Sequence, residues 1–149
     1  MVWVCFSGAN GRGGLFFLPK VKTMCKEQYM EVLREKMTPR YHHPAITHFL
    51  QDGAPCHKAK VVMEMRAAEQ VSLIDWPGNS PDLNPIKNAW SFMKEKFRKK
   101  SFKNMEELKT AITELLVTGM PLQYCKTLAR SMSHRLQAVV NANGHATKY

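Results

Sequence analysis

The stretch Ser80-Pro-Asp-Leu-Asn-Pro-Ile-Lys-Asn-Ala-Trp90 joins a turn-rich loop to the start of a helix. Two prolines and an asparagine stand in its first six residues, which is typical of a loop. Asn84 is a suitable N-cap, and Pro85 a suitable first helical residue because proline pre-sets φ and lacks only an N–H that the first turn leaves unbonded. The apolar side chains that follow at helical spacing are Ile86, Ala89, Trp90, Met93 and Phe97. We therefore expect a helix that starts near Pro85.

A second stretch, Gln51-Asp-Gly-Ala-Pro-Cys-His-Lys58, follows an apolar segment with strand-like alternation. Residues 45–51 are predicted to form a strand, and the turn residues Gly53 and Pro55 mark its end. Asp52 would then stand at the carboxyl end of a strand, where open α/β sheets bind their ligands. Taken without its neighbours, Asp52 is better explained as the start of a turn.

The remaining sequence alternates strand and helix signals. Strands are predicted at 1–7, 15–18, 45–51 and 71–74, with a glycine-rich turn at 8–14. Helices are predicted at 26–37, at 58–70, from about 85, at 105–115 and at 122–139. Thr38-Pro39 is expected to end the first of these helices, Gly119 and Asn143-Gly144 the last two, and residues 145–149 are expected to fray. This order predicts an α/β fold in which helices cover a mixed sheet.

The chain is strongly basic. Lys and Arg number 22 against 12 Asp and Glu, which gives a formal net charge of +10 over 149 residues. The excess favours a polyanionic partner, nucleic acid first and a membrane surface second, with a merely basic soluble protein as the alternative. No apolar run approaches the roughly 18–20 residues of a membrane span, so no membrane partner is expected, and residues 1–7 do not resemble a signal peptide. The widely separated Cys5, Cys25, Cys56 and Cys125 favour a reducing compartment over a disulfide framework or a structural zinc site.

The two stretches together resemble the catalytic core of Tc1/mariner-family transposases. The family pattern Q-D-x-A/D-P-x-H corresponds to residues 51–57, and W-P-x-x-S-P-D-L-N-P-I-E-x-x-W to residues 76–90. Residues 2–3 and 11–15 are also similar, so the resemblance covers about residues 1–140. It implies a ribonuclease-H-like mixed sheet with flanking helices. The expected DDE catalytic domain spans 1–149, with strands and helices to about 99 and a helical C-terminal part over 104–141.

The resemblance also implies an endonuclease and strand transferase of DNA transposition and integration. Three carboxylates of such an enzyme hold two Mg²⁺ or Mn²⁺ ions roughly 4 Å apart, one activating the nucleophile and one stabilising the leaving oxygen. The resemblance assigns the second carboxylate to Asp52. The third position follows after the family's spacing of 34 intervening residues, but it is occupied by Lys87. An ammonium group has no acceptor for a metal ion, so Lys87 cannot act as this ligand.

The first family carboxylate lies on a strand upstream of Val2, and no Asp or Glu precedes Glu27 here. We therefore expect this central first strand to be missing, and the fold to be marginal or dependent on a partner. Asp82 is better explained by a loop or capping role than as a substitute ligand. Asp52 remains as a weak residual metal ligand, Mg²⁺ or Mn²⁺ is not expected to bind productively, and catalysis is predicted to be lost.

Basic side chains gather after the helix that carries position 87. The densest run contains Lys94, Lys96, Arg98, Lys99, Lys100 and Lys103. These side chains could flank a DNA channel, with a solvated lysine-rich face as an equal alternative. Lys58 and Lys60 could also contact phosphates, and His57 could orient Asp52, meet a phosphate or simply pack in the loop.

Three functions stay open at this point. The first is a nuclear protein derived from a transposase, which binds double-stranded DNA without cutting it. The second is a non-catalytic interaction module, whose helical C-terminal third pairs with another copy, a related transposase or a nuclear partner. The third is a working nuclease that takes some of its ligands from another chain.

Overall fold

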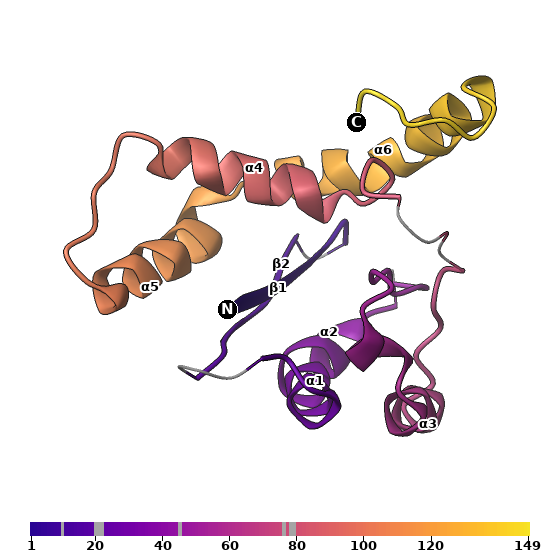
Figure 1. Cartoon of the computed structure of the whole chain (residues 1–149), viewed down its shortest axis with the longest axis horizontal. Coiled ribbons are helices and arrows are strands. Elements are labelled where there is room, and N and C mark those ends of the chain that lie inside the picture. Colours follow the sequence, from indigo (N-terminus) through magenta and orange to yellow (C-terminus); the bar gives the residue numbers. More distant parts are fainter. Residues whose placement is uncertain (10, 20–22, 45, 76, 78–79) are drawn as a thin grey trace. The chain divides into compact units, whose positions relative to one another are not determined.

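The computed structural model describes the chain except for residues 10, 20–22, 45, 76 and 78–79 (Figure 1). It divides into two compact units. The first comprises Met1–Cys5 and Gly13–Asn79, and the second comprises Phe6–Arg12 and Ser80–Tyr149. The N-terminal hairpin therefore contributes residues to both units.

Strands β1 (Val2–Ser7) and β2 (Gly11–Phe17) form the predicted antiparallel hairpin, and the Leu18 N–H donates to the Met1 carbonyl at 3.0 Å. The second strand begins earlier than the predicted residue 15, and the turn is correspondingly shorter. Gly11 has a φ of 80°, a conformation that glycine adopts without steric cost. At Gly14, β2 passes very close to Lys36. A Cβ at this position would collide with Lys36, so the close approach requires glycine.

The first helical segment runs further than predicted. Helix α1 (Lys26–Val32) continues as a π-helical stretch (Leu33–Met37) and then as the short helix α2 (Thr38–Tyr41). The prediction that Thr38-Pro39 ends the helix is wrong. The wide π turn allows a new helical start at Thr38, and Pro39 lies in its first turn, where the missing N–H breaks no bond.

The predicted strands at 45–51 and 71–74 are reduced to a single bridge among the described residues, with Ala45 outside them. Phe49 pairs in parallel with Leu73, and the Phe49 N–H donates to the Ser72 carbonyl at 2.8 Å. The Tyr41 hydroxyl accepts the Ser72 N–H at 2.8 Å, so a side chain takes the place of a ladder bond there. Two such short segments without further neighbours do not build a ladder. Among the described residues, the sheet is the antiparallel hairpin, and the parallel bridge lies outside it.

Helix α3 (Lys60–Ala68) lies beside α1 in the first unit (Figure 1). The predicted helix at 58–70 is split, because a 3₁₀ turn (Pro55–Lys58) precedes it and Ala59 between them is extended. The core that α1 and α3 enclose contains Tyr29, Leu33, Met37, Tyr41, Val62, Met65 and Val71. Their burial is the main stabilising contribution to this unit.

The second unit contains α4 (Ile86–Phe97), α5 (Met105–Glu114) with a π-helical end (Leu115–Gly119), and α6 (Leu122–Asn141). All three were predicted. The Asn104 side chain caps α5 by accepting the Glu107 N–H at 2.8 Å. Helix α6 ends in a Schellman motif, in which Gly144 N–H donates to the Val139 carbonyl at 2.9 Å.

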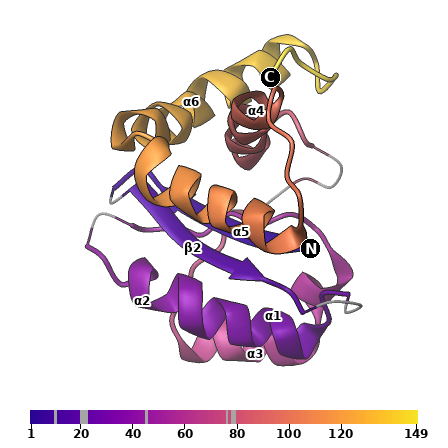
Figure 2. The same ribbon diagram turned by 90° about the vertical axis from the view of Figure 1, so that its left-hand side faces the viewer.

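Helices α4 and α6 lie side by side in both views (Figures 1 and 2). The buried apolar residues of this unit are Leu83, Ala89, Met93, Leu116, Met120, Cys125 and Leu128. Within the described part of the chain, no helix has the length and apolar character needed to cross a membrane.

Candidate functional site

The Asp52 corner lies in the first unit, three residues beyond the Phe49 bridge. The Asp52 carboxylate accepts the Ala54 N–H at 3.2 Å and lies 3.0 Å from Nδ1 of His57. That ring nitrogen is also 3.0 Å from the Asp52 carbonyl. The Asp52 side chain remains 58% exposed and that of His57 only 12%. The corner thus presents one carboxylate to solvent, with its rotamer restrained by a turn and an imidazole.

The Tyr29 ring packs against His57 at this corner. Its ring centroid lies 4.1 Å from that of His57, with the two rings tilted by 31°. The side chain is fully buried, and its hydroxyl donates to Oε1 of Gln51. Burial raises the pKa of Tyr29 far above its usual value, so the hydroxyl keeps its proton and remains a donor. Of the three roles considered for His57, the structure shows both the contact with Asp52 and packing in the loop against Tyr29.

Lys58 and Lys60 follow the corner in the same unit. Lys58 ends the 3₁₀ turn, and Lys60 begins α3 with its Nζ 3.8 Å from Oε1 of Glu64. Both side chains are exposed. Both are therefore accessible to an anionic partner, and neither belongs to the core.

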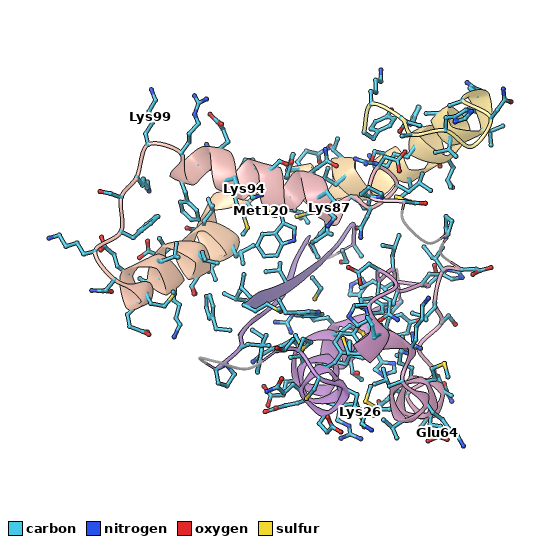
Figure 3. All side chains as sticks on the ribbon, viewed as in Figure 1. Lys26, Glu64, Lys87, Lys94, Lys99 and Met120 are labelled. Atoms are coloured by element: carbon cyan, nitrogen blue, oxygen red, sulfur yellow. The ribbon has the colours of Figure 1, made fainter. Side chains whose placement is uncertain are left out.

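Position 87 lies in the second unit, on the first turn of α4 (Figure 3). The Lys87 side chain is exposed, and its backbone N–H donates to the Asn84 carbonyl at 3.1 Å. The helix starts at Ile86, one residue later than predicted, yet the buried Asn84 side chain still accepts the Ile86 N–H at 3.1 Å. The prediction of Asn84 as N-cap is therefore wrong, because Pro85 occupies that position, although the Asn84 side chain still binds the N–H of the first helical residue.

A buried arginine on α6 supports the same loop, and the sequence analysis did not single it out. Arg135 is 2% exposed and donates to the Asp82 carbonyl, to Oδ1 of Asn88 and to Oγ of Ser131. The sequence did contain a signal, because the apolar stripe of α6 runs at a spacing of three and four residues and position 135 falls on it. An arginine at a core position of an amphipathic helix should have been taken as a candidate for a buried network.

The C-terminal residues are held, so the prediction that 145–149 fray is wrong. Both the N–H and the hydroxyl of Thr147 lie 3.0 Å from Oδ2 of Asp82, and the Arg135 guanidinium lies 4.7 Å from the Tyr149 ring centroid. The Thr147 N–H is the main cause that lowers the pKa of Asp82. Asp82 thus acts within its loop, as expected, by anchoring a segment 65 residues away.

The basic run begins on α4 and continues beyond it, with Lys94 on the helix and Lys99 on the segment that follows (Figure 3). All six members are exposed. Arg98 lies 3.3 Å from Glu95, and Lys96 lies over the Phe92 ring at 5.5 Å. Within the described part of the chain, Lys94, Lys99 and Lys100 have no acidic partner. This surface is therefore a candidate for contact with phosphates.

The donors that a pair of Mg²⁺ or Mn²⁺ ions requires are not present as a set. No group of three or more His, Cys, Asp or Glu side chains in the described residues could hold a metal ion. Asp52 has an imidazole as its side-chain partner, and position 87 carries an ammonium group. The donor chemistry of these residues does not fit a two-metal centre.

Residues 2–109 match the family model of the DDE superfamily endonucleases. The chain belongs to this family. It is 34% identical to the Tcb1 transposase of Caenorhabditis briggsae over 151 aligned residues, which cover 100% of this chain and 54% of that relative. The chain spans about half the length of the transposases it resembles in this way. The resemblance to Tc1/mariner transposases is thereby confirmed.

Solved structures confirm the fold class. The Mos1 transposase catalytic domain, determined with raltegravir and Mg, superposes with a TM-score of 0.84 at 18% identity, over 99% of this chain and 76% of that chain. A Mos1 mariner paired end complex with Mn gives the same TM-score at 19% identity, over 99% of this chain and 44% of that chain. The ribonuclease-H-like class predicted from the sequence is correct, and the two metals agree with the expectation of Mg²⁺ or Mn²⁺ for the family.

Proposed function

We propose that this DDE-family chain binds double-stranded DNA but has lost the metal-dependent cleavage and strand transfer of its family. The observation that carries the proposal is Lys87, exposed on the first turn of α4 at the position where the family motif has its third carboxylate. The backbone at this position is a regular helix start, in which the Asn84 side chain accepts the Ile86 N–H.

Donor chemistry supports the loss of catalysis. Two-metal phosphoryl transfer needs oxygen ligands that hold both ions and offset their charge. An ammonium group at position 87 donates three N–H bonds and accepts none, and its positive charge repels a divalent cation. Asp52 keeps its carboxylate, so a weak single-ion site is the most that we assign to it.

Charge supports the binding of DNA. The net charge of +10 is distributed in part over the exposed run that contains Lys94, Arg98, Lys99 and Lys100, with Lys58 and Lys60 after Asp52. The His57 imidazole, counted as neutral in this sum, remains a candidate phosphate contact. Cations on a surface of this kind bind phosphates with release of counterions, without base readout. We propose duplex DNA as its main partner, another copy or a related transposase as a protein partner, and a nuclear location as the compartment where such a partner is found.

The binding of DNA is tested by titrating a fluorescent duplex and following its anisotropy at several salt concentrations. The double variant Lys99→Gln/Lys100→Gln should weaken binding equally for unrelated sequences and reduce the salt slope by roughly two charges. Lys26→Gln is the matched control, because Lys26 is exposed on α1 and lies 3.8 Å from Glu27. An absence of binding at low salt would refute the DNA partner, and equal effects of the two variants would refute the assignment to residues 94–100.

The donor argument is tested by replacing the ammonium group. Lys87→Glu should bind Mn²⁺ at least roughly 10-fold more tightly than Lys87→Gln, because the carboxylate supplies a ligand and the amide only removes the charge. Isothermal titration with Mn²⁺ measures both. Equal affinity of the two variants would show that the substitution at position 87 does not limit metal binding.

A role as an interaction module has one specific observation in its favour. Leu136 and Val140, one turn apart on α6, are 50% and 67% exposed. Apolar side chains in this arrangement are typical of a helix that pairs with another helix. Sedimentation of Leu136→Glu against the parent chain tests this: an unchanged sedimentation coefficient over the micromolar range would refute self-association through this face.

A further inference from the structure

We infer that Arg135 is a positioning residue for position 87, fixing the 80–85 loop and the first turn of α4 from inside the second unit. The inference deepens the proposed function and rests on it in one respect, namely that position 87 is the third-ligand position. The contacts themselves are independent of that assignment.

The guanidinium group of Arg135 donates hydrogen bonds to three acceptors. Nη1 donates to the Asp82 carbonyl at 2.6 Å, Nη2 to Oδ1 of Asn88 at 2.7 Å, and Nε to Oγ of Ser131 at 2.8 Å. The first two acceptors lie on the loop and on α4, whereas the third lies on α6 itself. Because the guanidinium fork is planar and rigid, bonds to both of its ends fix the distance between the loop and the helix.

Such a group is a costly way to fill a core. Arg135 is 2% exposed, and no carboxylate pairs with its N–H groups in the described structure. An apolar side chain would avoid desolvating a charge, but it would leave the Asp82 carbonyl and Oδ1 of Asn88 without their donor. It also could not hold the loop and α4 in one fixed relation. The arginine therefore satisfies these acceptors and fixes the geometry between the two segments.

The residue next to position 87 is held from two sides. Asn88 gives its side-chain oxygen to Arg135, and its carbonyl accepts the Tyr124 hydroxyl at 3.2 Å. Tyr124 in turn stacks on Phe92 of α4, with ring centroids 4.9 Å apart. These bonds leave the neighbouring Lys87 side chain exposed. The contacts of Asn88 therefore fix the backbone next to position 87, whichever side chain that position carries.

The C-terminal segment completes the network from outside. Thr147 binds the Asp82 carboxylate through its N–H and hydroxyl, and the Tyr149 ring covers the Arg135 guanidinium. The ring compensates part of the buried charge through a cation–π contact. Asp82 is therefore held at its carbonyl by Arg135 and at its carboxylate by the segment that ends the chain.

Hydrogen exchange of the full chain tests the positioning directly. In Arg135→Lys the charge remains, but a compact ammonium group cannot reach the loop and Asn88 together. The amides of Lys87, Asn88 and Ala89 should then exchange roughly 10-fold faster relative to the Leu108 amide, which occupies the first turn of α5, because a hydrogen bond to a charged donor has been lost. Arg130→Lys, exposed on the same helix, is the matched control and should leave that ratio unchanged.

A uniform acceleration at α4 and α5 would overturn the inference, since it would show only a general loss of stability. If Arg135→Lys does not fold, Asn88→Leu keeps the side-chain volume, removes the acceptor of Nη2 and is measured in the same way. It should accelerate the amides of Lys87 and Ala89 by a smaller factor of roughly 3, as expected for loss of one hydrogen bond. No change in their ratio to Leu108 would contradict the inference.

Metal affinity separates this inference from the proposed function. In a Lys87→Glu background, Arg135→Lys should weaken the binding of Mn²⁺ roughly 10-fold, as loss of an outer supporting residue does, and Arg130→Lys should not. If Lys87→Glu binds no more Mn²⁺ than Lys87→Gln while the exchange result holds, the third-ligand assignment fails and the positioning stands. If the exchange result fails, the positioning fails whatever the metal affinity.

Discussion

The Asp52 corner and the start of α4 are built in opposite ways. At Asp52 the chemically active carboxylate is present, and its hydrogen-bonding partners lie two and five residues away in a short turn. At position 87 the side chain has the wrong chemistry for a metal ion, yet its neighbours are held by buried bonds that span 36, 47 and 53 residues. Long-range buried contacts fix a backbone independently of the side chain it presents. A ligand can therefore be replaced while its supporting structure remains.

The largest difference between the two regions should appear on removal of Arg135. Arg135→Met strands buried acceptors on the loop and on α4, and we expect the free energy of unfolding to fall by about 3 kcal/mol. Urea denaturation followed by circular dichroism measures it. Arg130→Met, at an exposed site on the same helix, should cost below about 0.5 kcal/mol. A similarly small cost for both variants would show that the long-range contacts of Arg135 do not stabilise the start of α4.

Removing one tyrosine hydroxyl in each region compares the two regions by the same chemical change. Tyr29→Phe removes the buried hydroxyl that donates to Gln51, and should lower the free energy of unfolding by about 1 kcal/mol. Tyr149→Phe keeps the ring that covers Arg135, and should cost below about 0.5 kcal/mol. Both are measured by urea denaturation. A larger effect at Tyr149 would indicate that its hydroxyl, and not its ring, anchors the end of the chain.

The attachment of the C-terminal segment should depend on pH through Asp82. The Thr147 N–H lowers the pKa of this carboxyl in the folded chain, so its contribution is complete above the ordinary aspartate value of about 3.9 and is lost as the pH falls through the lowered folded value. The stability difference between the parent chain and Asp82→Asn should be constant near neutral pH and shrink toward zero in acid. Denaturation at a series of pH values measures this difference. A difference that grows on acidification would have the wrong sign for this account.

The smallest effect is expected at Asp52. Its side chain is 58% exposed, and a polar contact of so exposed a group contributes little to stability. Asp52→Asn should change the free energy of unfolding by less than about 1 kcal/mol by urea denaturation. A loss as large as that of Arg135→Met would show that Asp52 is a structural residue, and would disqualify the variant as a probe of chemistry.

Short-range features of the fold were predictable from the sequence. Asn84 and Pro85 predict the start of α4 to within a residue. The contact between Asp52 and His57 also lies within one turn. The C-terminal helices follow from the spacing of their apolar residues. In each of these cases the physical cause is local, so a pattern of neighbouring residues is sufficient to predict it.

Features that depend on distant partners were not predictable in this way. The segment 45–51 has the composition of a strand, but a ladder needs a paired neighbour along its length, and among the described residues of the segment only Phe49 has one. Thr38-Pro39 ends an ordinary α-helix, but not one widened by a π turn. The attachment of residues 145–149 depends on Asp82, far away in the sequence. Tertiary pairing decides the first and third cases, and the geometry of the π turn decides the second.

The central claim is that the chain binds DNA without cutting it, and the nicking of supercoiled plasmid tests this most directly. The full chain is incubated with plasmid in Mg²⁺ and in Mn²⁺, with Asp52→Asn as the matched control. Both proteins should leave the same background of nicked circles at concentrations where the plasmid is bound. Metal-dependent nicking by the parent chain that Asp52→Asn abolishes would contradict it, and would show that the family's chemistry persists despite Lys87.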